Sequence, residues 1–289
     1  MIDIIKLGKW IYINPLVILL AVFCYINRNL ELLIISYAIM TLHELAHFIA
    51  AVCIGLVPSH IAIEPFGLNL RLKNQIVYSL YDEILLYISG PCVNLIFALL
   101  AYGINTKLHN IWIADFALKN ISLFIINILP IVPLDGGIIT KKILTYYVGC
   151  KTADNIMRVI TLALIGVLVT FGVILTLKSQ FNFSIVFLCV FLIMNIFTQK
   201  EKYNVDFVKE LMFYKHKMGE NKNEHIKLTV ADSSDCVRKS AERFTKRTFS
   251  IVFVLDKNAC VENIVTEPQI IDGIVKKGGE ITFADIHKK

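Results

Sequence analysis

Two histidines and a glutamate lie close together in an apolar part of the chain. They belong to the stretch Thr41-Leu-His-Glu-Leu-Ala-His47, an H-E-x-x-H sequence. On a helix, His43 and His47 are one turn apart, so both imidazoles project from one face. This spacing lets two ring nitrogens bind one Zn²⁺ and leaves Glu44 beside the metal, where it can deprotonate a bound water. The stretch therefore predicts a catalytic metal site; a chance match or two packed core histidines are the alternatives.

The surroundings of this stretch favour the metal site. From Leu32 to Leu56, leaving tyrosine and cysteine aside, the ionisable side chains are His43, Glu44 and His47. Charge is costly in hydrocarbon, and ionisable residues inside an apolar segment therefore indicate function.

A second polar element interrupts another apolar stretch, Asn127-Ile-Leu-Pro-Ile-Val-Pro-Leu-Asp-Gly-Gly137. Its prolines and glycines break a helix, and freed backbone groups at membrane depth are tolerated where they line a cavity. Asp135 is the one acid or base between Ile121 and Ile139. We expect it to join His43 and His47 as a zinc ligand, with the remaining position open for water. The alternative is a cytoplasmic helix-end residue just outside the hydrocarbon.

The elements that must position these residues are membrane spans. The chain has 289 residues, of which 56% are hydrophobic, and a mean hydropathy of +0.65, which is too apolar for an ordinary soluble domain. Its apolar residues form blocks about as long as a bilayer span. We predict six spans, the first retained rather than removed as a signal peptide. They cover residues 10–26, 32–56, 84–104, 121–139, 159–177 and 181–197.

The net charge of +6 is informative through its distribution. Lysine and arginine favour the side that holds both termini, so the positive-inside rule predicts that both termini are cytoplasmic. We expect this basic surface to meet anionic membrane lipid, and no nucleic acid, because no nucleic-acid-binding motif accompanies it. The seven cysteines are scattered, which argues against a disulfide framework.

A hairpin follows the histidine-bearing span. Apolar residues alternate on both sides of the Pro65 to Gly67 turn, which predicts two strands between Pro58 and Lys73. An edge strand there could hold an extended substrate by main-chain hydrogen bonds. A plain surface hairpin is an equal alternative.

The chain becomes charged after the last apolar block. We predict a membrane domain over residues 1–198, a linker over 199–224 that is an interfacial helix or a solvated connector, and a small domain over 225–289. In the small domain we expect strands at 228–230, 250–255 and 261–265 and helices at 234–246 and 268–277. Roughly sixty residues bury little surface, so we expect this domain to form a homo-oligomer. The predicted fold class is a polytopic α-helical membrane protein with about six transmembrane helices and a small cytoplasmic α+β domain.

These motifs together resemble those of the site-2-type intramembrane metalloproteases. The resemblance is carried by the His43 to His47 motif in a second span, by Gly90-Pro91…Asn94, and by Asn127…Pro133-Leu-Asp-Gly-Gly137. The six-span plan is similar to that of the subgroup ending in a CBS domain. The pattern Val254-Leu-Asp-Lys-Asn-Ala…Ile264-Val-Thr-Glu-Pro is similar to the second half of one CBS repeat.

The resemblance implies a set of roles. His43, His47 and Asp135 would hold one Zn²⁺ per chain, and Glu44 would activate the water. Asn127, Phe66 and Pro133 would contact substrate. Ala46 stands where this subgroup often has glycine, and being small and helix-favouring it should not impair activity. ATP is expected at the CBS domain only if dimerisation supplies the second repeat.

The resemblance also implies a substrate and a location. The expected function is removal of the pro-sequence of a sporulation sigma factor, a pro-sigma factor, with membrane proteins as inhibitors or regulators. The expected location is the cell membrane, in a spore-former the mother-cell membrane around the forespore. The same chemistry on an anti-sigma factor or signal-peptide remnant is one alternative. A CBS-regulated metal-ion transporter is another, which the glutamate of the H-E-x-x-H sequence disfavours; an inactive scaffold is disfavoured because all four chemical residues are present.

Overall fold

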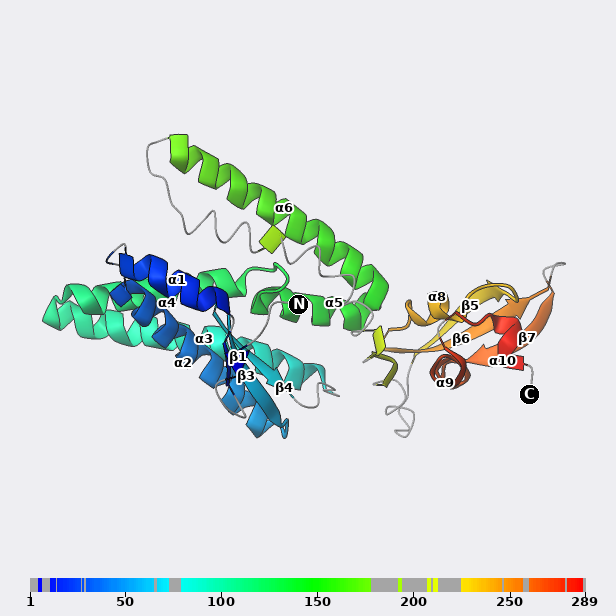
Figure 1. The fold of residues 1–289 in the computed structure, drawn as a ribbon. Coiled ribbons are helices and arrows are strands. Elements are labelled where there is room, and N and C mark those ends of the chain that lie inside the picture. The colour runs from blue at the N-terminus through cyan, green and yellow to red at the C-terminus, as the bar shows by residue number, and fades with distance from the viewer. Residues whose placement is uncertain are drawn as a thin grey trace. The chain divides into compact units, whose positions relative to one another are not determined.

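The structure is a computed structural model of the whole chain (Figure 1). The residues that it describes are 5–6, 11–13, 15–26, 28, 30–64, 67–72, 79–177, 192–193, 207–208, 210–212, 225–245, 247–256, 260–278 and 280–287. The chain divides into two compact units. The first comprises Met1–Gln75 and Tyr81–Ile139, and the second comprises Ile76–Leu80 and Thr140–Lys289. The domain boundaries expected from the sequence stay predictions.

Long apolar helices dominate the N-terminal two thirds of the described chain. They are α1 (Pro15–Ile26), α2 (Leu30–Cys53), α3 (Leu80–Leu108), α4 (Ile111–Ile128), α5 (Asp135–Val148) and α6 (Cys150–Leu177). Large apolar side chains point outward from them; Leu99 on α3, Trp112 on α4 and Val167 on α6 are each more than 60% exposed. Such outward-facing side chains are expected where lipid rather than water surrounds the helix.

Four helices in the described part of the chain are long and apolar enough to cross a membrane. They are Leu33–Cys53, Leu80–Leu108, Ile111–Ile128 and Cys150–Leu175. This confirms a multi-pass, mainly helical membrane protein, while six spans stay a prediction. Helix α1 has 12 residues, or about 18 Å, which is short of the roughly 30 Å hydrocarbon core. Nearly all of the predicted last span, 181–197, lies outside the described residues.

The predicted break in the fourth apolar block is confirmed. Helix α4 ends at Ile128 and α5 begins at Asp135, because Pro130 and Pro133 remove backbone donors in between. The start of α4 lies ten residues earlier than the predicted span. It therefore includes Asp115 and Lys119, which form an ion pair one turn apart and which lie before the predicted span.

The predicted hairpin is confirmed, and it belongs to a larger sheet. Strands β3 (Pro58–Glu64) and β4 (Gly67–Leu72) pair antiparallel, with Glu64 opposite Gly67. The sheet order is β1-β2-β3-β4, with β1 (Ile5–Lys6) and β2 (Ile11–Ile13) added from the N-terminal segment. Strand β4 is an edge of this sheet within the described residues, and it contacts α2, the helix that bears the histidines (Figure 1).

The C-terminal part of the second unit is a small α+β layer. Its elements are β5 (His225–Asp232), α8 (Val237–Ala241), β6 (Thr248–Leu255), β7 (Val261–Thr266), α9 (Glu267–Lys277) and α10 (Phe283–His287). The described sheet has the order β5-β6-β7, with β5 parallel and β7 antiparallel to β6. The strands and the second helix appear where the sequence predicted them, but α8 ends at Ala241, earlier than predicted, because the chain turns there toward β6.

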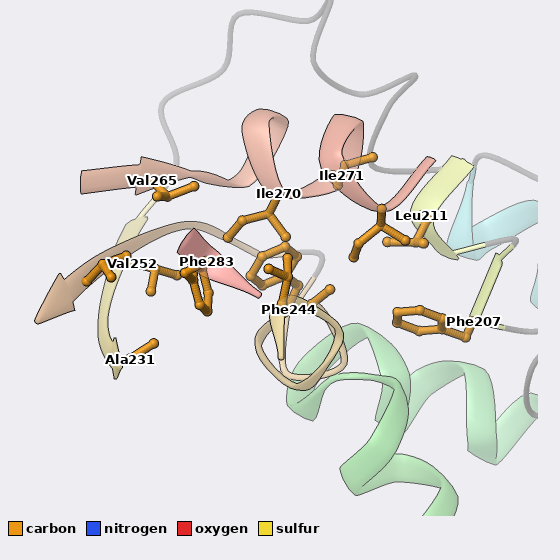
Figure 2. Close-up of a cluster of buried hydrophobic side chains, with 13 residues drawn as sticks. Phe207, Leu211, Ala231, Phe244, Val252, Val265, Ile270, Ile271 and Phe283 are labelled. Atoms are coloured by element: carbon orange, nitrogen blue, oxygen red, sulfur yellow. The ribbon is translucent and has the colours of Figure 1, made fainter. Parts of the chain in front are cut away.

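The core of this layer includes two residues from the expected linker. Phe207 and Leu211, each 4% exposed, pack in one cluster with Phe244, Ile271 and Phe283 of the C-terminal layer (Figure 2). An interfacial helix or a solvated connector, the two predicted forms of this linker, would leave these side chains facing a membrane surface or water. They lie in the protein core instead, because the small layer leaves an apolar end that two further side chains can cover.

This packing predicts a stability contribution from the linker. Phe207→Ala should lower the unfolding free energy of the C-terminal layer by about 3–5 kcal/mol, the usual effect of removing a buried phenylalanine. The measurement is hydrogen exchange of the β6 amides in the full chain over a urea series. Val208→Ala is the matched control, since Val208 is 49% exposed and should change stability little. Equal losses for the two variants would contradict the assignment.

Candidate metal centre

Helix α2 presents two histidines on one face, as the spacing predicted. His43 and His47 are 5% and 7% exposed, and their rings meet edge to face with centroids 4.8 Å apart. Their Nε2 atoms are 3.2 Å from each other. Two imidazole nitrogens at this separation can fill two of the four ligand positions around a tetrahedral metal ion.

The third ligand candidate comes from the first turn of α5. The Oδ2 atom of Asp135 lies 3.1 Å from His43 Nε2 and 3.3 Å from His47 Nε2. The three atoms thus form a nearly equilateral triangle. Tetrahedral zinc with bonds of about 2.0–2.1 Å requires its ligand atoms to stand about 3.3 Å apart. Two imidazoles and one carboxylate are also a known donor set of catalytic zinc, so the residues present fit the ion.

The outer nitrogens of both rings have partners that leave Nε2 for a metal. His47 Nδ1 is 2.7 Å from the carbonyl oxygen of Leu86, to which it donates, and 3.2 Å from Ser89 Oγ. His43 Nδ1 is 2.8 Å from Nδ2 of the Asn94 side-chain amide. All these partners come from α3. Metal-ligating histidines commonly hydrogen-bond through the second ring nitrogen, which fixes the ring and its tautomer.

Glu44 stands beside the two histidines on α2. A carboxylate oxygen of Glu44 and a nitrogen of each histidine all lie within 4.8 Å of one another, and the Glu44 side chain is half-buried. A carboxylate at this position is close enough to take a proton from a water held at the open side of the triangle.

Helix α3 can approach the histidines because residue 90 is glycine. A Cβ atom at Gly90 would lie 2.4 Å from His47 Nε2 and 2.7 Å from His43 Nε2. No side chain fits there without displacing the ligand atoms. Pro91 follows this glycine directly, and α3 continues through it. Which helix this glycine would face could not be read from its position in the sequence.

Glycines also place Asp135. A Cβ atom at Gly136 would lie 2.2 Å from the carbonyl oxygen of Ile128, and one at Gly137 would lie 2.3 Å from that of Ile131. The segment between α4 and α5 therefore folds back closely against the first turn of α5. That fold fixes the carboxylate opposite the histidines, at a helix N-terminus that favours negative charge.

The expected substrate-contacting residues are placed less fully. Asn127 lies in the last turn of α4 and is half-buried, and Pro133 lies two residues before Asp135. Phe66 lies outside the described residues. Their roles stay predictions.

The chain is similar in sequence to Stage IV sporulation protein FB of Bacillus subtilis (strain 168), with 25% identity over 139 residues. The match covers 45% of this chain and 48% of that protein, so the chain spans about half the length of this relative. In three dimensions it is similar to a site-2 protease from Methanocaldococcus jannaschii, with a TM-score of 0.51 and 21% identity; the match covers 66% of this chain and 91% of that chain. The chain has the fold of a site-2 protease. No family model matches it.

These similarities confirm the resemblance to site-2 proteases that the sequence motifs predicted. The structural match reaches most of the length of the archaeal site-2 protease. The histidine pair, Glu44 and Asp135 all lie in the first compact unit.

The close approach of α3 to the two histidine rings leads to a prediction about zinc binding. Gly90→Ala should reduce zinc affinity by more than about tenfold, because the added methyl group displaces both ligand nitrogens. Zinc per chain after equilibrium dialysis of the purified protein measures this. Gly103→Ala on the same helix is the control, since a Cβ atom there has no neighbour within 4 Å among the described residues. Equal zinc retention by the two variants would show that α3 does not approach the site as described.

Proposed function

We propose that this chain is an intramembrane zinc endopeptidase. The observation that carries the proposal is the triangle of His43 Nε2, His47 Nε2 and Asp135 Oδ2, with sides of 3.1–3.3 Å, next to the carboxylate of Glu44. The fold shared with a site-2 protease supports it. His43, His47 and Asp135 are the residues that would hold one zinc ion per chain.

The roles of the chain's own residues follow from this geometry. When bound, zinc makes a water nucleophilic at neutral pH and polarises the scissile carbonyl. Glu44 accepts the proton of that water and passes it to the leaving nitrogen of the cut peptide. The apolar helices around the site limit access of bulk water, which strengthens the electrostatic interactions inside.

The substrate has to be extended at the cut site, because a helix hides its peptide bonds. Strand β4 is a candidate to hold such a segment, since it is a sheet edge in the described structure and contacts α2. An added strand would gain main-chain hydrogen bonds with little dependence on side chains. Asn127, Phe66 and Pro133 are proposed to line the same path.

The proposed substrate is a pro-sigma factor. The similarity to Stage IV sporulation protein FB supports it over an anti-sigma factor or a signal-peptide remnant. The proposed location is the cell membrane, with both termini in the cytoplasm and, in a spore-former, in the mother-cell membrane around the forespore. Inhibitory or regulatory membrane proteins also belong to this proposal.

The C-terminal layer is proposed to be a CBS-like regulatory domain that pairs with a second copy. Ile226, Leu228 and Val230 point to one face of β5 and are each more than 60% exposed, and Ile264 of β7 is 51% exposed. Val230 is in register with Phe253, and Phe253 with Ile264, so these side chains form one apolar face. The same patch can cover itself across a two-fold axis without any charge complementarity. ATP binding stays a prediction that depends on this pairing.

The first prediction of the proposed function concerns Glu44. Glu44→Gln should reduce cleavage of a co-expressed, tagged pro-sigma factor by about 10²–10⁴-fold, because the general base is lost. Zinc content should remain one ion per chain, since Glu44 is not among the proposed ligands. Gel mobility of the substrate and metal analysis of the purified protein give the two readings.

Glu31→Gln, at the exposed start of the same helix, is the matched control and should cleave like the native chain. Cleavage by Glu44→Gln at the native rate would contradict the proposed base. A metal-ion transporter would instead show zinc flux in vesicles that depends on His43 and little on Glu44.

The second prediction concerns the apolar sheet face. Leu228→Lys should lower the dimer fraction of the full chain in detergent, because a desolvated charge would be buried at the contact. Chemical cross-linking and mass photometry measure this fraction. Val275→Lys is the control, since Val275 is 54% exposed on α9, the helix that packs against the sheet on its buried side. A native chain that stays monomeric would refute the pairing.

A further inference from the structure

We propose that Asn94 is a positioning residue that accepts a hydrogen bond from His43 Nδ1 and thereby holds the His43 ring for zinc. This inference rests on the proposed zinc site and deepens it. Asn94 lies on α3, one turn after Gly90, so that both residues share the helix face turned toward the histidines.

The burial of Asn94 needs an explanation. Its side chain is 0% exposed within an apolar membrane helix. Burying an amide without hydrogen bonds costs on the order of 1–3 kcal/mol according to mutational data. The structure places the amide nitrogen Nδ2 2.8 Å from His43 Nδ1, while Oδ1 has no hydrogen-bond partner among the described residues. The His43 imidazole is thus the hydrogen-bond partner that accounts for a polar residue here.

The chemistry of a zinc-bound imidazole decides which end of the amide faces the ring. A neutral histidine that binds zinc through Nε2 carries its proton on Nδ1, which is then a donor. The amide must therefore present its oxygen, because an NH₂ group there would place two donors against each other. The oxygen and nitrogen of an asparagine amide are assigned by their partners, and a half-turn of the amide exchanges them. In the zinc-bound protein, Asn94 Oδ1 accepts from His43 Nδ1.

The two histidines depend on α3 in different ways. His47 Nδ1 has the backbone carbonyl oxygen of Leu86 as acceptor at 2.7 Å, which no substitution removes. The partner of His43 Nδ1 is instead a side chain, that of Asn94. A single substitution on α3 can therefore release the His43 ring from its orientation. The loss of such a partner typically costs about 10–100-fold in metal affinity or activity.

The test compares two variants of nearly the same size. Asn94→Leu removes both polar atoms, and Asn94→Asp keeps an acceptor without a donor. Asn120→Leu on α4 is the matched control, because Asn120 is also 0% exposed but bonds to Phe116 O within its own helix. Zn²⁺ affinity of the purified full chain is measured by competition with a chromophoric chelator, and the visible spectrum of the Co²⁺ form reports the ligand geometry.

Asn94→Leu should weaken zinc binding about 10–100-fold and alter the Co²⁺ spectrum, while Asn94→Asp and Asn120→Leu should bind like the native chain. At saturating zinc, Asn94→Leu should lower kcat with little change in KM, since Asn94 does not contact the substrate. Native-like zinc affinity in Asn94→Leu would overturn the inference and leave the proposed function standing. An Asn94→Asp variant as weak as Asn94→Leu would also overturn it, by showing that a donor is required. A native chain that binds no Zn²⁺ would refute the proposed function itself and the inference with it.

Discussion

The close approach of two imidazoles and one carboxylate inside an apolar bundle is the constraint on which the described structure depends. The atoms involved are 3.1–3.3 Å apart. A carboxylate such as that of Asp135, which is 14% exposed, costs several kcal/mol to bury unless it is paired. The hydrogen bonds from the histidines and the N-terminus of α5 offset this cost. These groups stay at the stated distances only if three separate helices, α2, α3 and α5, keep their positions.

Each of these helices contributes a different feature to the site. Helix α2 supplies both imidazoles from consecutive turns, which requires no tertiary contact. Helix α3 supplies no ligand, but the absence of a side chain at Gly90 allows it to lie against the rings. Helix α5 supplies Asp135, and the glycines that follow let the preceding segment fold against its first turn. Residues with little or no side chain are thus as necessary as the ligands themselves.

The parts of the chain outside the site follow a different physical rule. The N-terminal sheet satisfies backbone hydrogen bonds where the chain leaves the helical pattern, as any segment near a membrane must. The C-terminal layer is too small to bury a large core and uses Phe207 and Leu211 of the preceding segment to extend it. In the described residues one face of its sheet is apolar and exposed. A domain this small has too few helices to cover both faces of the sheet, which also makes its folded state only marginally stable.

The sequence by itself determined the features that depend on local spacing. The H-E-x-x-H stretch gave the shared helix face of His43 and His47, alternation gave the hairpin of β3 and β4, and the prolines gave the break before Asp135. Only the tertiary structure decided the features that depend on contacts between distant segments. These are the approach of Gly90 to the rings, the contact of Asn94 with His43, and the burial of Phe207. A periodic pattern records which residues share a face, but it does not record which other helix that face meets, because that choice is made by packing over many residues at once.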